Sequence, residues 1–427
     1  MTKKINVLVF PAEGQNAYEL HDALSTCVNI HLIGGTSVAR HGEFLFENYI
    51  KNIPFISDKN FLQEFNEILR VNEIDVIFPT HDTIVKYLIE NEEKINAKII
   101  SGDRETADVC RDKSLTFERF KETDILPKRF YDAEEISFPA FVKPREGQGA
   151  VGARKITDSH DVAKIDFSNN IVTEYLPGEE CTVDCLTDRH GILRYVSPRS
   201  RDRILAGMSV RGSNIALTID IQHIADTLNS KLNFRGLWYF QIKKNKDGVF
   251  KLLEVSTRCA GTMCQTRAKG INLPLLSVYI AMGYDVDISD NAYHLIMDRA
   301  LIGRYKLDID YNYVYIDFDD TITLRGKVNL NTIRFMYQCY NKGKKLILLT
   351  RHENDLEETL NHYAISKLLF YKIIHLNHLD ESKSQYIHHL DSIFIDNAFK
   401  EREEVRQVHH IPVFDVDQIE FLLEWRI

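Results

Sequence analysis

The stretch Tyr313-Val314-Tyr315-Ile316-Asp317-Phe318-Asp319-Asp320-Thr321 decides the fold of the C-terminal part of this chain. A run of β-forming residues that ends in acids is typical of a buried strand with carboxylates at its carboxyl end. In parallel α/β sheets, functional groups gather at the carboxyl ends of the strands. Asp317 could attack phosphorus, and Asp319 could protonate a leaving group and then activate water. The oxygens of Asp317 also suit Mg²⁺.

Two later apolar runs end in polar side chains. Residues 346–349 lead into Thr350, and residues 392–395 lead into Asp396. Thr350 could hold a phosphoryl oxygen, and the Asp396 carboxylate suits the same Mg²⁺. Lys383, which lies between these runs, could neutralise a phosphoryl group; a lysine on a solvated helix face is the alternative.

Aspartate, hydroxyl, lysine and aspartate in this order resemble the haloacid dehalogenase (HAD) superfamily of phosphohydrolases, over residues 310–427. The resemblance implies a Rossmann-like parallel sheet and a Mg²⁺-dependent phosphatase. By this resemblance, Asp317 would be the nucleophile and a metal ligand, and Asp319 would be the acid/base and a metal ligand. Thr350 and Lys383 would hold the phosphate. Asp396 would be a further metal ligand.

The C-terminal pattern departs from the superfamily at one position. Asn397 stands where a second acid often follows the metal-binding aspartate, and Glu401 could assist through water. The stretch between Thr321 and Thr350 is too short for an additional cap domain, so a capless fold is expected. A degenerate domain kept as a scaffold is the alternative.

Composition indicates a soluble protein of several domains. The chain has 427 residues, 44% hydrophobic and 27% charged, with a net charge of −9. The acidic balance argues against a general nucleic-acid binder. No apolar run is long enough for a transmembrane helix, and the start has no signal core, so a cytoplasmic location is expected. Whether the chain forms a homodimer is left open by the sequence.

The seven cysteines are scattered and form no C-x-x-C pair, which favours reduced thiols. Cys181 with Cys185, or Cys259 with Cys264, could be metal ligands, but no histidine spacing accompanies them. Buried structural cysteine is therefore the favoured interpretation.

The N-terminal part alternates strand and helix patterns. Strands are expected over 5–10, 28–35, 74–79 and 98–100, and helices over 18–24 and 83–91. This pattern predicts a small doubly wound domain over residues 1–100. Residues 11–16 lack a G-x-G-x-x-G dinucleotide fingerprint. A domain over 101–290 and a linker over 291–309, with a helical piece around 293–297, complete the expected division.

A glycine-rich loop follows a short strand that carries Lys143. Gly147, Gly149 and Gly152 would let backbone N–H groups approach phosphates, and Lys143 would supply a charge. The loop is not a P-loop, and an ordinary glycine-rich hairpin is the alternative.

Paired strands are expected over 236–243 and 250–255, joined by the turn at 245–248. Gln241 and Glu254 have the chemistry of ligands for a hard cation, and Arg258 could bind a phosphate. Glu179 and Glu180, after a Pro-Gly turn, are ambiguous in register, and Glu180 is preferred.

These residues occur in the order seen in ATP-grasp ligases, and the resemblance covers residues 1–285. It is closest to the carbamoyl-phosphate-synthase-like and amino-acid-ligase-like branches, which carry a small domain before the ATP-grasp fold. An α/β and α+β multidomain chain is expected. By resemblance, the ATP site comprises Lys113, Lys143, Gly147, Gly149, Gly152, Glu174, Tyr175, Leu176 and Glu180.

The same resemblance implies that Gln241 and Glu254 bind Mg²⁺ and that Arg258 steadies the transferred phosphoryl group or the acyl-phosphate. Ser256 stands where family members carry an asparagine, and a hydroxyl is a poorer Mg²⁺ ligand. Acceptor recognition could involve the arginines of 199–203, the loops at 207–212 and 259–262, and His81-Asp82. Solvated surface roles are the alternative.

The combination predicts a bifunctional enzyme with ATP and Mg²⁺ as cofactors. One half would join a small carboxylate to an amine through an acyl-phosphate, and the other would hydrolyse a phosphorylated metabolite. The alternatives are a regulatory protein that binds nucleotide or phosphate without turnover, and a phosphatase regulated by ATP.

Overall fold

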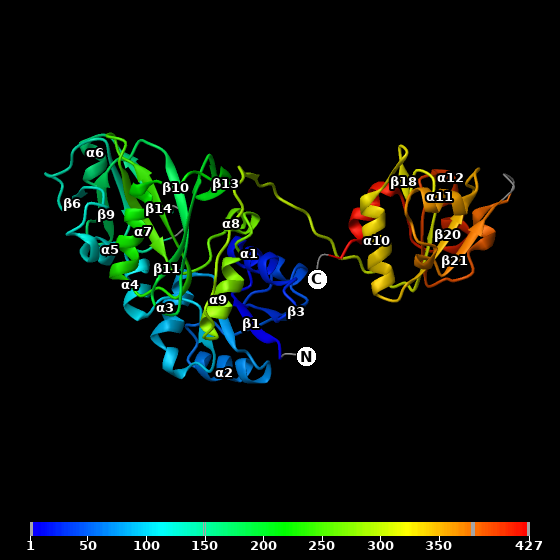
Figure 1. Cartoon of the computed structure of the whole chain (residues 1–427), viewed down its shortest axis with the longest axis horizontal. Helices are drawn as coiled ribbons and strands as arrows, with labels where there is room; N and C mark the ends of the chain where they lie inside the picture. The colour runs from blue at the N-terminus through cyan, green and yellow to red at the C-terminus, as the bar shows by residue number, and fades with distance from the viewer. Residues whose placement is uncertain (1–2, 148, 150, 377–380, 425–427) are drawn as a thin grey trace. The chain divides into compact units, whose positions relative to one another are not determined.

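The structure is a computed structural model that describes residues 3–147, 149, 151–376 and 381–424. The chain divides into two compact units between Leu301 and Ile302 (Figure 1). Gln148 and Ala150 of the glycine-rich loop lie outside the described residues.

The first unit begins with a five-stranded parallel sheet, the leading sheet, in the order β3-β2-β1-β4-β5. Its strands are β1 (Ile5–Phe10), β2 (Ile30–Gly35), β3 (Asn48–Ile50), β4 (Val76–Pro79) and β5 (Lys98–Ile99). Five helices accompany or follow them: α1 (Gln15–Leu24), α2 (Phe61–Val71), α3 (Asp82–Glu90), α4 (Arg104–Arg111) and α5 (Lys113–Phe120).

Both faces of the leading sheet are covered by helices. Along β1, Val7 and Val9 pack with α1 in one core, whereas Leu8 and Phe10 pack with α2 and α3 in another. Side chains of a strand alternate between faces, so continuous apolar runs are required where both faces are buried. This explains why β1 and β4 contain almost only apolar residues.

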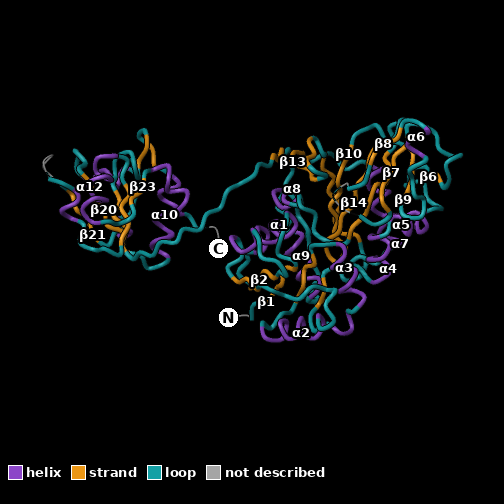
Figure 2. Tube along the Cα trace, turned by 180° about the vertical axis from the view of Figure 1, so that it is seen from behind, coloured by secondary structure: helices purple, strands orange, loops and turns teal. Residues whose placement is uncertain are grey.

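Two antiparallel sheets follow in the first unit. The small sheet, in the order β6-β9-β7-β8, lies at the end of the unit away from β1 and α2 (Figures 1 and 2). It contains β6 (Arg129–Phe130), β7 (Ala140–Pro144), β8 (Arg154–Ile156) and β9 (Asn170–Glu174), with α6 (Ser159–Val162).

The long sheet has the order β11-β10-β14-β15. Its strands are β10 (Glu180–Thr187), β11 (Leu193–Ser200), β14 (Gly236–Lys244) and β15 (Phe250–Ser256). One face packs on the apolar side of α7 (Ile219–Lys231), around the buried Trp238. The helices α8 (Cys264–Ala268) and α9 (Leu273–Ala281) follow, and α9 packs in the same core as α1.

A three-stranded antiparallel sheet completes the first unit. It consists of β12 (Arg203–Leu205), β13 (Met208–Ser213) and β16 (Ile296–Asp298). The helical piece expected around residues 293–297 is therefore wrong. The segment instead pairs with β13, in the register Gly212 to Met297, because an open strand edge offers its backbone hydrogen bonds.

The second unit has a five-stranded parallel sheet in the order β21-β20-β17-β22-β23, with β18 and β19 as a separate ribbon. The strands are β17 (Tyr313–Ile316), β18 (Thr323–Leu324), β19 (Lys327–Val328), β20 (Lys345–Thr350), β21 (Lys372–His375), β22 (Ser392–Ile395) and β23 (Val413–Phe414). The helices are α10 (Leu330–Asn341), α11 (Leu356–His362) and α12 (Phe399–His409).

The α/β class and the parallel sheets predicted from the sequence are confirmed. The strands expected at 313–316, 346–350 and 392–395 are neighbours in one sheet. Short elements such as β3 were not predicted, nor was α2. The domain boundaries inside the first unit stay predictions.

Candidate active sites

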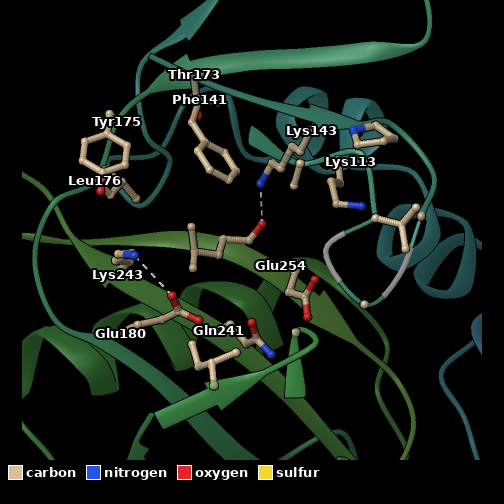
Figure 3. Close-up of a pocket in the computed structure, with 18 of the residues that line it drawn as sticks. Lys113, Phe141, Lys143, Thr173, Tyr175, Leu176, Glu180, Gln241, Lys243 and Glu254 are labelled. Carbon is tan, nitrogen blue, oxygen red and sulfur yellow. Dashed lines mark hydrogen bonds and ion pairs between the residues drawn. The ribbon is translucent and has the colours of Figure 1, made fainter. Parts of the chain in front are cut away.

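A first cavity of about 260 Å³ lies between the small sheet and the long sheet (Figure 3). Lys143 projects into it from β7, Glu180 from β10, and Gln241 and Glu254 from β14 and β15. Most residues predicted for ATP and its metal line this cavity, namely Lys113, Lys143, Gly147, Gly149, Glu174, Tyr175, Leu176, Glu180, Gln241 and Glu254. Gly152, Ser256 and Arg258 do not line it.

Two lysines meet at one end of the first cavity. Lys143 Nζ donates to the carbonyl of Leu253 at 2.7 Å, and Lys113 Nζ donates to the carbonyl of Arg145 at 3.4 Å. Burial, and then the charge of Lys113, lower the pKa of Lys143 to about 8. Burial also lowers the pKa of Lys113. An anion placed between these ammonium groups would be held by both and would raise both pKa values again.

Local structure fixes Lys113 at this position. Asp112 caps α5, because its Oδ1 accepts a hydrogen bond from the Ser114 N–H at 2.7 Å. Arg145, two residues after Lys143, forms an ion pair with the same carboxylate. The cap therefore places Lys113 as the first residue of the helix and ties it to the strand end that carries Lys143.

The glycine-rich loop borders the lysines. Gly149 and Gly152 have φ values of 63° and 77°, in the left-handed region that favours glycine. A Cβ on Gly207 would lie 2.8 Å from the backbone of Gly149, so the β12–β13 turn packs directly on this loop. Gly152 packs beside Pro144 instead of lining the cavity.

The other end of the first cavity is apolar. Tyr175, Leu176 and Phe141 lie there together (Figure 3). Leu253 and Ile204 add apolar surface to the cavity. Phe141 was not predicted as a site residue from the sequence. The feature of the sequence that indicates Phe141 is the alternation of side chains along β7. Ala140 and Val142 belong to the core, so Phe141 shares the opposite face of the strand with Lys143. A flat aromatic base would fit such a wall.

Glu180 lies on the cavity floor between two cations. Its Oε1 is 2.7 Å from Arg201 Nε, and its Oε2 is 3.3 Å from Lys243 Nζ. Glu179 instead pairs with Lys244 at 2.7 Å and does not line the cavity. Among this pair of acids, the geometry thus makes only Glu180 available to a ligand in the first cavity.

Gln241 and Glu254 are direct partners in the register of the β14–β15 hairpin. Cross-strand partners are close neighbours on one face, so an amide oxygen and a carboxylate meet at the cavity. Both are suitable Mg²⁺ ligands. No group of three or more histidine, cysteine, aspartate or glutamate side chains arranged for a metal occurs among the described residues. These two residues fit Mg²⁺ when phosphate oxygens complete its coordination.

A second cavity of about 170 Å³ shares Lys113, Gly147, Gly149, Arg201, Gly207, Gln241 and Glu254 with the first. Ser256 and Arg258 line this second cavity. Ser256 Oγ donates to Asp82 Oδ1 at 3.1 Å, and Arg258 binds the same carboxylate. Asp82, the first residue of α3, lines the second cavity as predicted, whereas His81 does not.

The predicted arginines at 199, 201 and 203 differ in environment. Arg199 is buried and donates to both oxygens of Asp184, at 2.9 and 2.8 Å. Arg199 and Arg201 line the second cavity, whereas Arg203 pairs with Asp298 at the surface. The loops at Gly207 and Gly261 also reach the second cavity. Arg299 lines it too, although its segment was predicted to be a linker.

A third cavity, of about 390 Å³, lies at the carboxyl ends of the strands in the second unit. Asp317 follows β17, Asp396 follows β22, and Lys383 Nζ lies 2.7 Å from Asp317 Oδ1 and 2.6 Å from Asp396 Oδ2. Burial raises the pKa of both carboxyl groups, and Lys383 opposes this. Lys383 is buried, so a solvated position for it is wrong.

Asp319 is more exposed than Asp317 and Asp396, and a histidine contacts its carboxylate. His352 Nδ1 lies 3.0 and 2.9 Å from the two oxygens of Asp319, and its Nε2 lies 2.9 Å from Thr359 Oγ1. His352 was not predicted as a site residue from the sequence. His352 follows Thr350 by two residues and lies at the same strand end, and this position in the sequence is the feature that indicates a site residue.

Thr350 itself does not line the third cavity, whereas its neighbours Arg351 and His352 do, together with Glu401. Thr350 is fully buried, and its Oγ1 has no hydrogen-bond partner among the described residues. Glu401 Oε1 pairs with Arg351 at 2.6 Å. Asp317, Asp319 and Asp396 offer oxygens that suit Mg²⁺, and Asn397 lies beside them. Two of these oxygens are taken by Lys383 in the structure.

Comparison with protein families gives one match. Residues 166–297 match the model of a family described as ATP-grasp in the biosynthetic pathway with Ter operon. The matched residues include β9, the long sheet and the first two residues of β16, and hence the floor of the first cavity. No curated protein matches the chain in sequence.

Solved structures that resemble this chain in fold include the following three. Biotin carboxylase from Campylobacter jejuni has a TM-score of 0.55 and 17% identity, and the match covers 68% of this chain and 74% of that one. N5-carboxyaminoimidazole synthetase from Staphylococcus aureus, complexed with ADP, has a TM-score of 0.59, 11% identity, and coverages of 70% and 83%. An L-amino acid ligase from Bacillus licheniformis has a TM-score of 0.51 and 14% identity, and the match covers 66% of this chain and 75% of that one.

The family match and the shared fold support an ATP-grasp domain in this chain. Two structural features bear on the other expectations. All seven cysteines have free thiols. Among the described residues, no helix has the length and apolarity that crossing a bilayer requires.

Proposed function

We propose that the chain is a bifunctional enzyme, with an ATP-dependent carboxylate–amine ligase in the first unit and a Mg²⁺-dependent phosphomonoesterase in the second. The observation that carries the ligase proposal is the junction of the first and second cavities at Lys113, Gln241 and Glu254. A nucleotide in the first cavity would present its terminal phosphate to a substrate in the second.

In the ligase half, the substrate carboxylate attacks the γ-phosphorus of ATP, and the bond from that phosphorus to the β–γ bridging oxygen breaks. ADP and an acyl-phosphate result. The amine then attacks the acyl carbon, inorganic phosphate leaves, and the amine loses a proton. Lys113 and Lys143 hold the phosphate oxygens, and Arg258 steadies the transferred group.

The remaining groups position the nucleotide. Residues 174–176 and Phe141 line the base end, and Glu180 would accept hydrogen bonds from the ribose hydroxyls. Gln241, Glu254 and Ser256 would hold Mg²⁺, which neutralises phosphate charge when bound. Ser256 also donates to Asp82, so its hydroxyl oxygen stays available to a cation.

In the phosphatase half, which resembles the HAD superfamily, Asp317 attacks the phosphorus of a phosphomonoester and forms an aspartyl-phosphate. Asp319 protonates the departing alcohol and then removes a proton from the water that hydrolyses the intermediate. Lys383 and Thr350 hold the phosphoryl oxygens. Asp317, Asp319 and Asp396 would hold Mg²⁺, whose charge offsets that of the phosphoryl group.

The two activities would act in sequence in one small-molecule pathway. The phosphatase would act either on the ligation substrate before the ligase joins it or on the ligation product afterwards. Measurement of ADP and phosphate release by the full chain, with Mg²⁺·ATP, pooled carboxylates and amines, and an aryl phosphate, tests the proposal. Lys143→Ala should stop ADP release only, and Asp317→Asn should stop aryl-phosphate hydrolysis only. Nucleotide binding without ADP release from any pool would instead favour a regulatory protein.

A further inference from the structure

Arg299 brings a positive charge to the second cavity. Among the described residues, no carboxylate forms an ion pair with this charge. It follows β16, and its backbone N–H donates to the Val210 carbonyl of β13 at 2.7 Å. Its Nη1 donates to Gln15 Oε1 at 3.1 Å, and its Nη2 donates to the Gly261 carbonyl. The guanidinium is thus fixed on the cavity wall by neutral oxygens.

The other arginines reported above in this cavity are neutralised. Arg199 is paired with Asp184, Arg201 with Glu180, and Arg258 with Asp82. The carboxylate of Glu19 acts on Arg299 only at longer range, because it forms its own ion pair with Arg267 at 3.0 Å. A half-buried guanidinium with only neutral acceptors is suited to bind an anionic group.

The position of Arg299 separates it from the reacting end of the site. Its partners Gln15 and Gly261 line the second cavity and not the first. The phosphoryl group would enter at the shared residues Lys113 and Glu254. Gln15 is also the first residue of α1, whose N-terminus adds a favourable potential for negative charge at the same place.

We propose that the second cavity binds a carboxylate substrate with a second anionic group, and that Arg299 binds this second group. The inference rests on the proposed ligase function and names its substrate class. A second carboxylate and a phosphate share the required chemistry. A phosphate would also make the ligation substrate or product a candidate for the second unit.

Three small acids that share the propionate unit and differ only in the group on its carbon 3 distinguish these sources: propionate, succinate and 3-phosphonopropionate, whose phosphonate cannot be hydrolysed. Each is titrated calorimetrically into the full chain with Mg²⁺ and the non-hydrolysable analogue β,γ-methylene-ATP. At least one dianionic acid should bind about tenfold or more tightly than propionate, as expected for a charge-assisted hydrogen bond. Which acid does so identifies the second group.

Arg299→Gln should abolish this preference while the affinities for propionate and for the nucleotide stay unchanged, and Arg299→Lys should keep part of it. Arg203→Gln, which removes a surface charge of the same sheet, is the matched control and should keep the preference. Equal binding of all three acids, no binding of any, or a preference that survives in Arg299→Gln would overturn the inference. Failure of the nucleotide analogue to bind would instead contradict the ligase function itself.

Discussion

Arg258 and Asp82 form a bidentate ion pair, with Nε 2.8 Å from Oδ1 and Nη2 2.9 Å from Oδ2. Burial alone would raise the pKa of Asp82, but the charge and hydrogen bonds of Arg258 lower it. The pair joins the first helix residue after β4 to the loop after β15. Asp82 therefore orients the arginine that we assign to the transferred phosphoryl group.

This orientation predicts a defect in the rate rather than in nucleotide binding. Asp82→Asn should lower ADP formation about tenfold to a hundredfold, because a misplaced catalytic group loses that much. The affinity for ATP, measured by calorimetry, should stay close to wild type. Asp247→Asn, in the exposed β14–β15 turn, is the matched control. Equal loss of ATP affinity and rate would mean that Asp82 supports the nucleotide cavity instead.

The nucleophile assignment predicts a complete loss. Asp317→Asn should abolish hydrolysis of an aryl phosphate, because an amide cannot form the aspartyl-phosphate. ATP binding should be unaffected. Asp310→Asn, an exposed change of the same kind in the same unit, should hydrolyse the aryl phosphate at the wild-type rate. Wild-type hydrolysis by Asp317→Asn would disprove the assignment.

The lowered pKa of Lys143 predicts a pH dependence for nucleotide binding. Lys143 is charged below its pKa of about 8 and neutral above it. ATP affinity should therefore be constant below that pH and fall as pH rises through it, with proton uptake on binding at the higher pH. Lys143→Gln should bind ATP weakly and lose this dependence. An affinity profile of the variant that parallels the wild type would assign the titration to another group.

The two sites share no residue, which predicts independent activities. Glu254→Ala should leave aryl-phosphate hydrolysis near wild type, and Asp317→Asn should accumulate a phosphorylated ligation product or leave a phosphorylated acceptor unused. Comparison of a fragment that begins near Ile302 with the full chain checks the first half of this claim. If circular dichroism shows a folded fragment that is inactive on small phosphates, the first unit takes part in the phosphatase.

A stability prediction follows from the buried pair of Arg199 and Asp184. Asp184→Ala should lower the free energy of unfolding by about 3–5 kcal/mol, because the charge of Arg199 is left buried without its partner. Urea unfolding followed by circular dichroism measures the change. A loss under about 1 kcal/mol would show that Arg199 finds solvent or another acceptor.

Sequence reasoning was most effective where the signal was local. The neighbouring placement of Gln241 and Glu254 follows from a hairpin with an obvious turn, and the carboxyl ends of β17, β20 and β22 follow from apolar runs. The ion pair of Asp82 with Arg258 depends on packing between segments far apart in the chain. His352 beside Asp319 depends on how the chain turns after β20. Neither has a periodic signal.

The segment that contains Arg299 shows a second limit. Its composition resembles a connector, and only pairing of β16 with the open edge of β13 brings Arg299 to the second cavity. Such pairing is decided by an available strand edge elsewhere in the fold, which local propensity cannot predict.

The most direct test of the bifunctional account uses full-length Asp317→Asn, in which phosphate can no longer arise from the second unit. The variant is incubated with Mg²⁺·ATP and pooled carboxylates and amines, and ADP and phosphate are followed by ³¹P NMR. The account predicts equal amounts of ADP and inorganic phosphate, formed only when both pools are present. ADP formation that ignores both pools, or none above the blank although ATP binds, would contradict it.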